Sequence, residues 1–160
     1  MRKALIVGVD YYEKIGSLHG CVNDALAVAG ALEEHANHGA NFITPNVLTA
    51  TSKEDAITRR TLKEEVRKLF EWDEEIALFY FAGHGSQYRD DETFDQDTGY
   101  NGTILPTDAR NPDGSPGDIF DVELKTLKDK ATARGIYFVT IFDSCNSATA
   151  TRDGAAGQSR

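Results

Sequence analysis

The chain has 160 residues and a mass of 17.6 kDa, which is the size of one ordinary domain, and no apolar run is long enough to span a membrane. Its 17 basic and 26 acidic residues give a net charge of −9, and ten of the acidic residues lie within residues 90–123 beside a single base. This charge argues against nucleic acid and anionic membranes as partners. The acidic region suits a basic peptide or a metal ion, or it is simply a solvated loop.

The predicted elements alternate between strands and helices. Short apolar runs rich in branched and aromatic residues predict buried strands, and apolar residues at helical spacing predict amphipathic helices. The elements are, in chain order, a strand at 3–9, a helix at 21–36, a weaker strand at 46–50, a helix at 59–72, a strand at 75–82, a helix at 121–130 and a strand at 136–142. Residues 83–120 are rich in Gly, Asp, Asn and Pro, with a short apolar island at 103–105. The alternation predicts a three-layer α/β/α fold with a mainly parallel sheet.

Two residues with catalytic potential follow predicted strands. His84 comes after the strand at 75–82, and Cys145 comes after the strand at 136–142. We expect both at one edge of the sheet, where ligands bind in open α/β folds. A thiol beside an imidazole is the minimal equipment for covalent acyl transfer, because the imidazole promotes the thiolate and later protonates the leaving amine. The backbone amides of Gly85 and Cys145 are natural donors to an oxyanion.

Each of these residues also has a structural interpretation. A lone cysteine is more often a small, inert, buried thiol, and a loop histidine often makes only a structural hydrogen bond. The placement of both at strand ends beside small residues favours catalysis. Two cysteines form no disulfide framework, so we expect a reducing, cytoplasmic setting. His35 and His38 lack further ligands, so no metal site is predicted there.

Two carboxylates accompany the predicted strand ends. Asp143 stands two residues before Cys145, and Asp24 lies in the first turn of the helix at 21–36. Each has a structural alternative: Asp143 could be a turn residue that accepts from local backbone amides, and Asp24 could stabilise the terminus of its helix. If both side chains face the cleft, they form an anionic pocket suited to Arg or Lys. Nucleotide binding has no support, because no phosphate-binding loop is present.

Four short segments stand out by their order and separation. They are residues 18–25 (LHGCVNDA), 80–87 (YFAGHGSQ), 97–102 (DTGYNG) followed by 106–108 (PTD), and 141–145 (IFDSC). Together they resemble the large catalytic subunit of the caspase-like cysteine peptidases, specifically the metacaspases and their prokaryotic relatives, the orthocaspases. The resemblance covers nearly the whole chain.

This resemblance implies a caspase-like fold and a cysteine endopeptidase that cleaves after Arg or Lys. By this resemblance, His84 and Cys145 match the catalytic dyad, and Gly85 matches the residue whose amide binds the oxyanion. Asp24 and Asp143 match the carboxylates of the pocket for the basic residue, with Cys21 in the pocket wall. The alternative is a catalytically silent caspase-like scaffold that binds partners, but such members typically lack the histidine or the cysteine. A flavodoxin-like ligand-binding domain is a third interpretation.

The resemblance also bears on domains, partners and cofactors. Residues 1–150 are expected to form the large subunit, completed by strands from a small C-terminal subunit of the same precursor. Residues 151–160 are expected to be a flexible linker, with Arg160 and Arg152 as possible sites of self-processing. Many metacaspases need calcium, which binds several carboxylates. The matching positions are Asn101, Asp121, Val122 and Arg152, of which only Asp121 is a carboxylate, so we predict activity without calcium.

Overall fold

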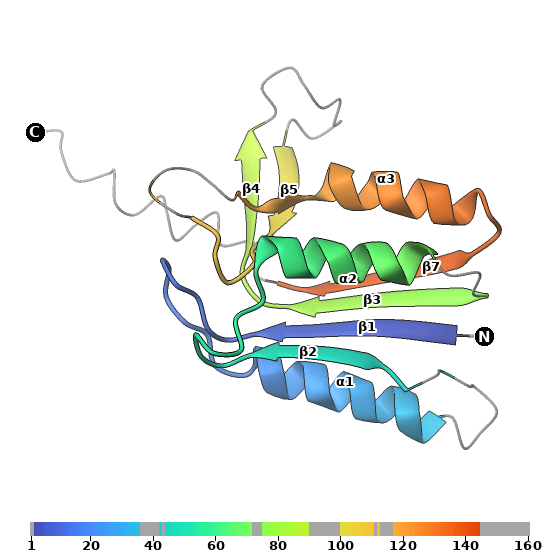
Figure 1. Cartoon of the computed structure of the whole chain (residues 1–160), viewed down its shortest axis with the longest axis horizontal. Helices are drawn as coiled ribbons and strands as arrows, with labels where there is room; N and C mark the ends of the chain where they lie inside the picture. Colours follow the sequence, from blue (N-terminus) through green and yellow to red (C-terminus); the bar gives the residue numbers. More distant parts are fainter. Residues whose placement is uncertain are drawn as a thin grey trace, which may run out of the picture.

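The secondary structure follows the predicted alternation of strands and helices. The computed structural model describes residues 2–35, 42, 44–71, 75–89, 100–110, 112 and 117–144. Its elements are β1 (Arg2–Val9), α1 (Cys21–His35), β2 (Asn46–Ala50), α2 (Arg59–Glu71), β3 (Ile76–Ala82), β4 (Gly85–Arg89), β5 (Tyr100–Ile104), β6 (Ile119–Phe120), α3 (Asp121–Thr132) and β7 (Tyr137–Asp143) (Figure 1).

Four strands form a parallel sheet in the order β2-β1-β3-β7. The register sets Ala82 of β3 beside Gly8 of β1 on one side and beside Asp143 of β7 on the other. All four strands therefore end at the same edge of the sheet. In the described part of the chain β7 pairs only with β3, so it is an edge strand. The sheet confirms the predicted α/β class.

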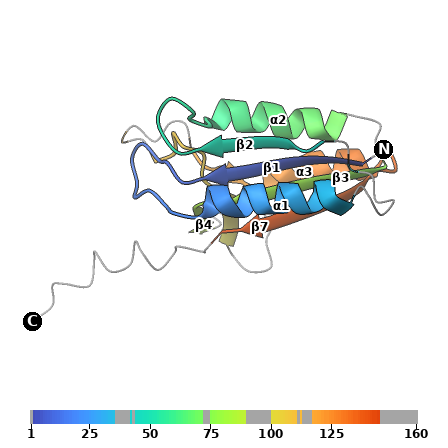
Figure 2. The same cartoon turned by 90° about the horizontal axis from the view of Figure 1, so that it is seen from below.

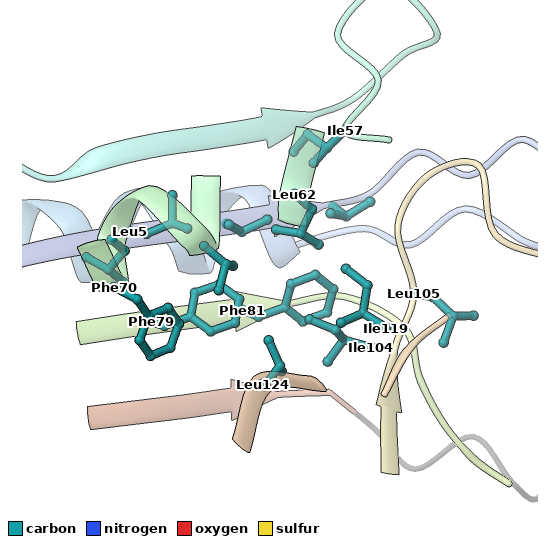
Figure 3. Close-up of a cluster of buried hydrophobic side chains, with 14 of the residues drawn as sticks. Leu5, Ile57, Leu62, Phe70, Phe79, Phe81, Ile104, Leu105, Ile119 and Leu124 are labelled. Atoms are coloured by element: carbon teal, nitrogen blue, oxygen red, sulfur yellow. The ribbon is translucent and has the colours of Figure 1, made fainter. Parts of the chain in front are cut away.

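Two cores lie on opposite faces of this sheet, because successive side chains of a strand point to opposite sides. Leu5 and Phe79 belong to the larger core, which packs beneath α2 and α3 (Figure 3). Ile6 and Tyr80 belong to the smaller core, which packs against α1. Helices α2 and α3 thus cover one face and α1 covers the other, which gives the three predicted layers (Figures 1 and 2).

Helix α1 approaches the end of β1 very closely at Gly8. A β-carbon at this glycine would lie 2.6 Å from the carbonyl oxygen of Cys21 and 2.7 Å from the Cβ of Ala25. Both distances are shorter than real contacts, so only glycine fits here. The close approach brings the first turn of α1 to the carboxyl edge of the sheet.

A second, antiparallel sheet contains β4, β5 and β6 and continues from the end of β3. Its strands lie within residues 83–120, where the sequence predicts only an apolar island at 103–105. That island overlaps the end of β5. The pattern does not indicate β4 or β6, because one is mostly polar and the other is two residues long.

Ion pairs join α2 to α3 above the larger core. The Arg59 Nη2 atom donates to both carboxylate oxygens of Glu123, at 3.0 and 2.9 Å, and the Lys63 ammonium donates to Glu123 Oε1 at 2.6 Å. The backbone N–H of Arg59 donates to Asp108 Oδ1 at 2.8 Å. Burial raises the pKa of Glu123, but Lys63, the N–H of Phe120 and Arg59 together outweigh it and hold the pKa below its usual value.

Candidate active site

His84 lies where the chain passes from the parallel sheet into the small sheet. It stands between Gly83, which follows β3, and Gly85, which begins β4. Its carbonyl oxygen accepts the N–H of Leu105 at 3.0 Å, which fixes this turn to the residue that follows β5. His84 is therefore held at the carboxyl edge of the parallel sheet, where the sequence predicts it.

One hydrogen bond defines which nitrogen of the His84 ring is basic. The Nε2 atom lies 2.8 Å from the carbonyl oxygen of Gly16. Because a carbonyl oxygen can only accept, Nε2 carries the proton in this bond. In the neutral ring Nδ1 then has the lone pair, and it is the atom that can take a proton from a nucleophile.

Tyr12 lies directly against His84. The Tyr12 Oη atom accepts the backbone N–H of His84 at 2.7 Å, and the two ring centroids are 4.7 Å apart at an interplanar angle of 56°. A β-carbon on Gly83 would lie 2.6 Å from this same oxygen, so the glycine makes room for the tyrosine hydroxyl.

Cys145, the predicted nucleophile, lies outside the described residues. The described chain runs through β7 to Ser144, one residue before it. In the register of β3 and β7, Ala82 pairs with Asp143. His84 and Cys145 each follow their paired position by two residues. The catalytic roles of both residues stay predictions.

The structure brings three carboxylates together around the thiol of Cys21. Burial, together with the negative charges of Asp10, Asp24 and Asp143, raises the pKa of the Cys21 thiol to about 11. Asp24 and Asp143 are both exposed, so their charges face solvent at the end of the sheet. Exposed carboxylates of this kind can pair with a guanidinium or an ammonium group, and their role in binding a basic residue stays a prediction.

Tyr80 holds one of these carboxylates in place. Its hydroxyl donates to Asp143 Oδ2 at 3.2 Å. Burial, together with the negative charges of Asp143 and Asp24, raises the pKa of Tyr80 to about 12. The phenol is therefore a hydrogen-bond donor at neutral pH, and it ties Asp143 of β7 to β3.

Four groups that shape this site are not predicted from the sequence, namely Asp10, Tyr12, the Gly16 carbonyl and Tyr80. Asp10 caps the start of α1, since its Oδ1 accepts the N–H of Cys21 at 2.9 Å. The one available signal is its position directly after a predicted strand. Tyr80 begins the segment 80–87, but its contact with Asp143 is not marked by the sequence pattern. Nothing in the pattern marks Tyr12 or the Gly16 carbonyl, because their roles depend on contacts between residues far apart in the chain.

Several predicted residues receive no structural test. His38, Arg152, Arg160 and residues 90–99 lie outside the described residues, and the side chain of His35 is not described. Gly85 begins β4 opposite Ile104 of β5, and its role as an oxyanion donor stays a prediction.

The described residues contain no group of three or more His, Cys, Asp or Glu side chains that could hold a metal ion. At the positions that match the calcium site, Asp121 supplies a carboxylate and Val122 supplies no side-chain ligand. The Oδ2 atom of Asp121 accepts the N–H of Gly102 at 3.1 Å, while its Oδ1 atom is buried with no hydrogen-bond partner. A calcium ion takes six or more oxygen ligands with several carboxylates, and these positions supply one carboxylate, so activity without calcium stays a prediction.

Comparison with known proteins identifies the class to which this fold and site belong, the caspase-like peptidases. Residues 2–152 match the family model described as "Metacaspase, peptidase C14 domain". The match covers more than half of the chain, so the chain belongs to the metacaspase family. The resemblance predicted from the four sequence segments is confirmed.

Similar proteins include fungal metacaspases. Metacaspase-1 of Coccidioides immitis is 29% identical over 155 residues, which cover 93% of this chain and 32% of that protein. Metacaspase-1A of Aspergillus oryzae is 30% identical and is covered over 35% of its length. This chain thus spans about a third of the curated relatives that it matches.

A solved structure has the same fold. Protein GSU0716 from Geobacter sulfurreducens superposes with a TM-score of 0.66 at 24% sequence identity, over 96% of this chain and 54% of that one. The likeness supports the three-layer architecture. In the described part of this chain, no helix is long and apolar enough to cross a membrane.

Proposed function

We propose that this chain is the catalytic part of a cysteine endopeptidase that hydrolyses peptide bonds after Arg or Lys. The observation that carries the proposal is the geometry of His84, whose Nε2 is bonded to the Gly16 carbonyl so that Nδ1 is the base. Cys145 follows in the chain two residues after Asp143, the partner of Ala82 in the sheet register. Membership of the metacaspase family supports the same chemistry.

The reaction begins when the Cys145 sulfur attacks the carbonyl carbon of the scissile peptide bond. Nδ1 of His84 takes the thiol proton, and the backbone amides of Gly85 and Cys145 donate to the oxygen that becomes negative. The C–N bond then breaks, and the imidazolium gives its proton to the leaving amine. Water, deprotonated by the same nitrogen, hydrolyses the thioester, which releases the new carboxyl terminus and restores the thiol.

The carboxylates of Asp24 and Asp143 select the basic residue before the cleaved bond. Arg is preferred to Lys, because its planar guanidinium can engage two carboxylates at once. The hydrogen bond from Tyr80 to Asp143 Oδ2 leaves the Oδ1 atom for the substrate. The substrates are basic peptides and proteins, and nucleic acid and membranes are not partners of this acidic chain.

A small C-terminal subunit of the same precursor completes the sheet beside β7. Support comes from β7 itself, which pairs only with β3 in the described part of the chain and carries exposed Tyr137, Ile141 and Phe142. An apolar edge strand is a liability that folded proteins normally cover. The enzyme separates this subunit by cutting its own precursor after Arg160 or Arg152, which both fit the proposed specificity.

Hydrolysis of fluorogenic peptides that present Arg, Lys or Asp before the reporter tests the proposal. We expect cleavage after Arg and Lys, and none after Asp. Cys145→Ala should reduce turnover to background, and His84→Ala should cost nearly as much, because nucleophile and base act as a unit. Cys21→Ala is the matched control, because it removes the other thiol and leaves the nucleophile, so turnover should remain measurable.

The same variants test self-processing when the longer precursor is expressed and its fragments are identified by mass spectrometry. The wild type should cut itself at one of the two arginines, while Cys145→Ala should stay intact. Near-normal peptide turnover by Cys145→Ala would sink the proposed mechanism. Absence of turnover by the wild type would favour the alternative, a catalytically silent caspase-like scaffold, against which the presence of both His84 and Cys145 argues.

A further inference from the structure

Tyr12 is buried beside the proposed general base, although the peptidase mechanism gives it no task. Its side chain is 4% exposed, and it belongs to the loop between β1 and α1. Burial raises the pKa of the phenol, so the group stays protonated and cannot itself act as a base at neutral pH.

Three contacts from this loop reach three different parts of His84. The Tyr12 hydroxyl oxygen accepts the backbone N–H at 2.7 Å, which fixes the main chain. The Tyr12 ring packs against the imidazole at a centroid distance of 4.7 Å, which limits rotation of the ring. The Gly16 carbonyl accepts from Nε2 at 2.8 Å, which sets the tautomer. A histidine held in this way has one ring orientation available.

The loop that carries Tyr12 is itself fixed on both sides. The N–H groups of Asp10 and Tyr11 donate to the carbonyl of Ala50, at 2.9 and 3.0 Å. The N–H of Glu13 donates to the carbonyl of Thr107 at 3.0 Å. Both neighbours of Tyr12 are therefore hydrogen-bonded to other parts of the fold. This fixes Tyr12, and with it His84, relative to the end of the sheet.

The fit is close enough that a neighbour has to be glycine. A β-carbon at Gly83 would lie 2.6 Å from the Tyr12 Oη atom and 2.9 Å from the Phe81 ring. The hydroxyl oxygen thus occupies the space next to the turn that carries the imidazole. A purely apolar packing residue would not need this oxygen or its hydrogen bond to the His84 N–H.

We propose that Tyr12 is a positioning residue that holds His84 in the orientation needed to take the proton of Cys145. The inference rests on the proposed peptidase function. It predicts that Tyr12 acts on the chemical step and on the state of the nucleophile, and that it does not act on the pocket for the basic residue.

The test compares Tyr12→Phe with the wild type in the full-length protein. Phenylalanine keeps the ring against the imidazole and removes only the hydroxyl, so the variant should fold. We expect kcat on an Arg peptide to fall by about three- to tenfold, the scale of one net hydrogen bond, with KM unchanged. Thr132→Val is the control, because it removes an exposed hydroxyl at the C-terminal end of α3, away from His84, and its kcat should match the wild type.

A second readout separates positioning from loss of folded protein. Alkylation of Cys145 by iodoacetamide, followed by mass spectrometry across pH, reports the thiolate that the nearby imidazole stabilises. Cys21 serves as an internal reference, because its raised pKa makes it slow to react at neutral pH. In Tyr12→Phe the midpoint for Cys145 should move to higher pH, and the fraction of protein that finally reacts should equal that of the wild type.

The outcomes distinguish this inference from the proposed function. An unchanged kcat and an unchanged alkylation midpoint in Tyr12→Phe would overturn the positioning role. A loss of activity in proportion to a smaller fraction of protein with reactive Cys145 would also overturn it, because it would mean that less of the variant is folded. Full activity of Cys145→Ala in the same series would overturn the proposed function, and the role of Tyr12 would fall with it. A lower kcat together with a raised midpoint supports the inference.

Discussion

At the scale of single residues, the site combines a histidine whose tautomer is fixed with carboxylates that remain open to solvent. The Gly16 carbonyl holds the proton of His84 on Nε2, so the basic nitrogen is set before any substrate binds. Asp24 and Asp143 are exposed, while Tyr80 beneath them is buried and donates to Asp143. A cationic side chain can therefore reach both carboxylates, and the hydrogen bond from Tyr80 restrains one of them.

The charge of Asp143 is expected to set the preference for a basic residue before the cleaved bond. Asp143→Asn keeps the shape of the side chain and removes the charge. We expect kcat/KM for Arg peptides to fall by more than about tenfold. This is near the lower end of what the loss of one partner of a charge pair costs, because the Asp143 side chain is exposed.

Steady-state kinetics with Arg and Lys peptides measure this effect. Asp129→Asn is the matched control, because it makes the same change at an exposed position on α3, where it pairs with Lys125. Its kcat/KM should equal that of the wild type. Preferential cleavage after Asp, or an unchanged rate in Asp143→Asn, would contradict the assignment of the pocket.

At the scale of elements, the ion pairs between α2 and α3 hold the helical layer in one piece. Glu123 accepts from Arg59, from Lys63 and from the N–H of Phe120, and its side chain is 27% exposed. Glu123 thus joins the N-terminal turns of both helices. This layer covers Phe79 and Phe81 of β3, the strand that ends at the catalytic edge.

Removing the charge of Glu123 should destabilise the fold. We expect Glu123→Gln to lower the free energy of unfolding by about 1–2 kcal/mol near pH 7, between the effects typical of exposed and buried ion pairs. The folded-state pKa lies below its usual value, so the contribution is complete above that value and is lost as pH falls through the lowered pKa. The difference between variant and wild type should therefore shrink in acid.

Urea denaturation of both proteins at several pH values measures this difference. Glu64→Gln is the matched control, because Glu64 forms an exposed pair with Arg60 on the same helix and should contribute little. A difference that stays constant down to the lowest pH would show that Glu123 acts through packing and not through its charge.

At the scale of the whole molecule, the net charge of −9 could attract calcium ions, which bind carboxylates. The residues that match the family's calcium site include one carboxylate, Asp121, among Asn101, Val122 and Arg152. We expect peptide turnover in excess EGTA to match turnover with saturating calcium, because a single carboxylate does not hold this ion. Magnesium at equal ionic strength controls for screening of the acidic surface. Large, saturable activation by calcium alone would reveal a site elsewhere, with residues 90–97 as the first candidate.

Local sequence patterns are enough to predict the fold class and the order of the large elements. Continuous apolar runs at β1, β3 and β7 predict buried parallel strands, and the helical spacing of Leu62, Val66 and Leu69 predicts α2. These signals are local, since each depends on residues within one element. Four motif segments in order also identified the family, and with it the candidates His84, Cys145, Asp24 and Asp143.

The groups that surround His84 and the carboxylates come together through long-range contacts, which local patterns do not predict. Tyr12 reaches His84 across 72 positions of the chain, and Tyr80 reaches Asp143 across 63. No periodicity or spacing encodes such pairs, because they arise where β1, β3 and β7 end together and Gly8 and Gly83 allow close approach. The small sheet likewise depends on pairing between short strands, whose stability comes from their neighbours and not from their own sequence.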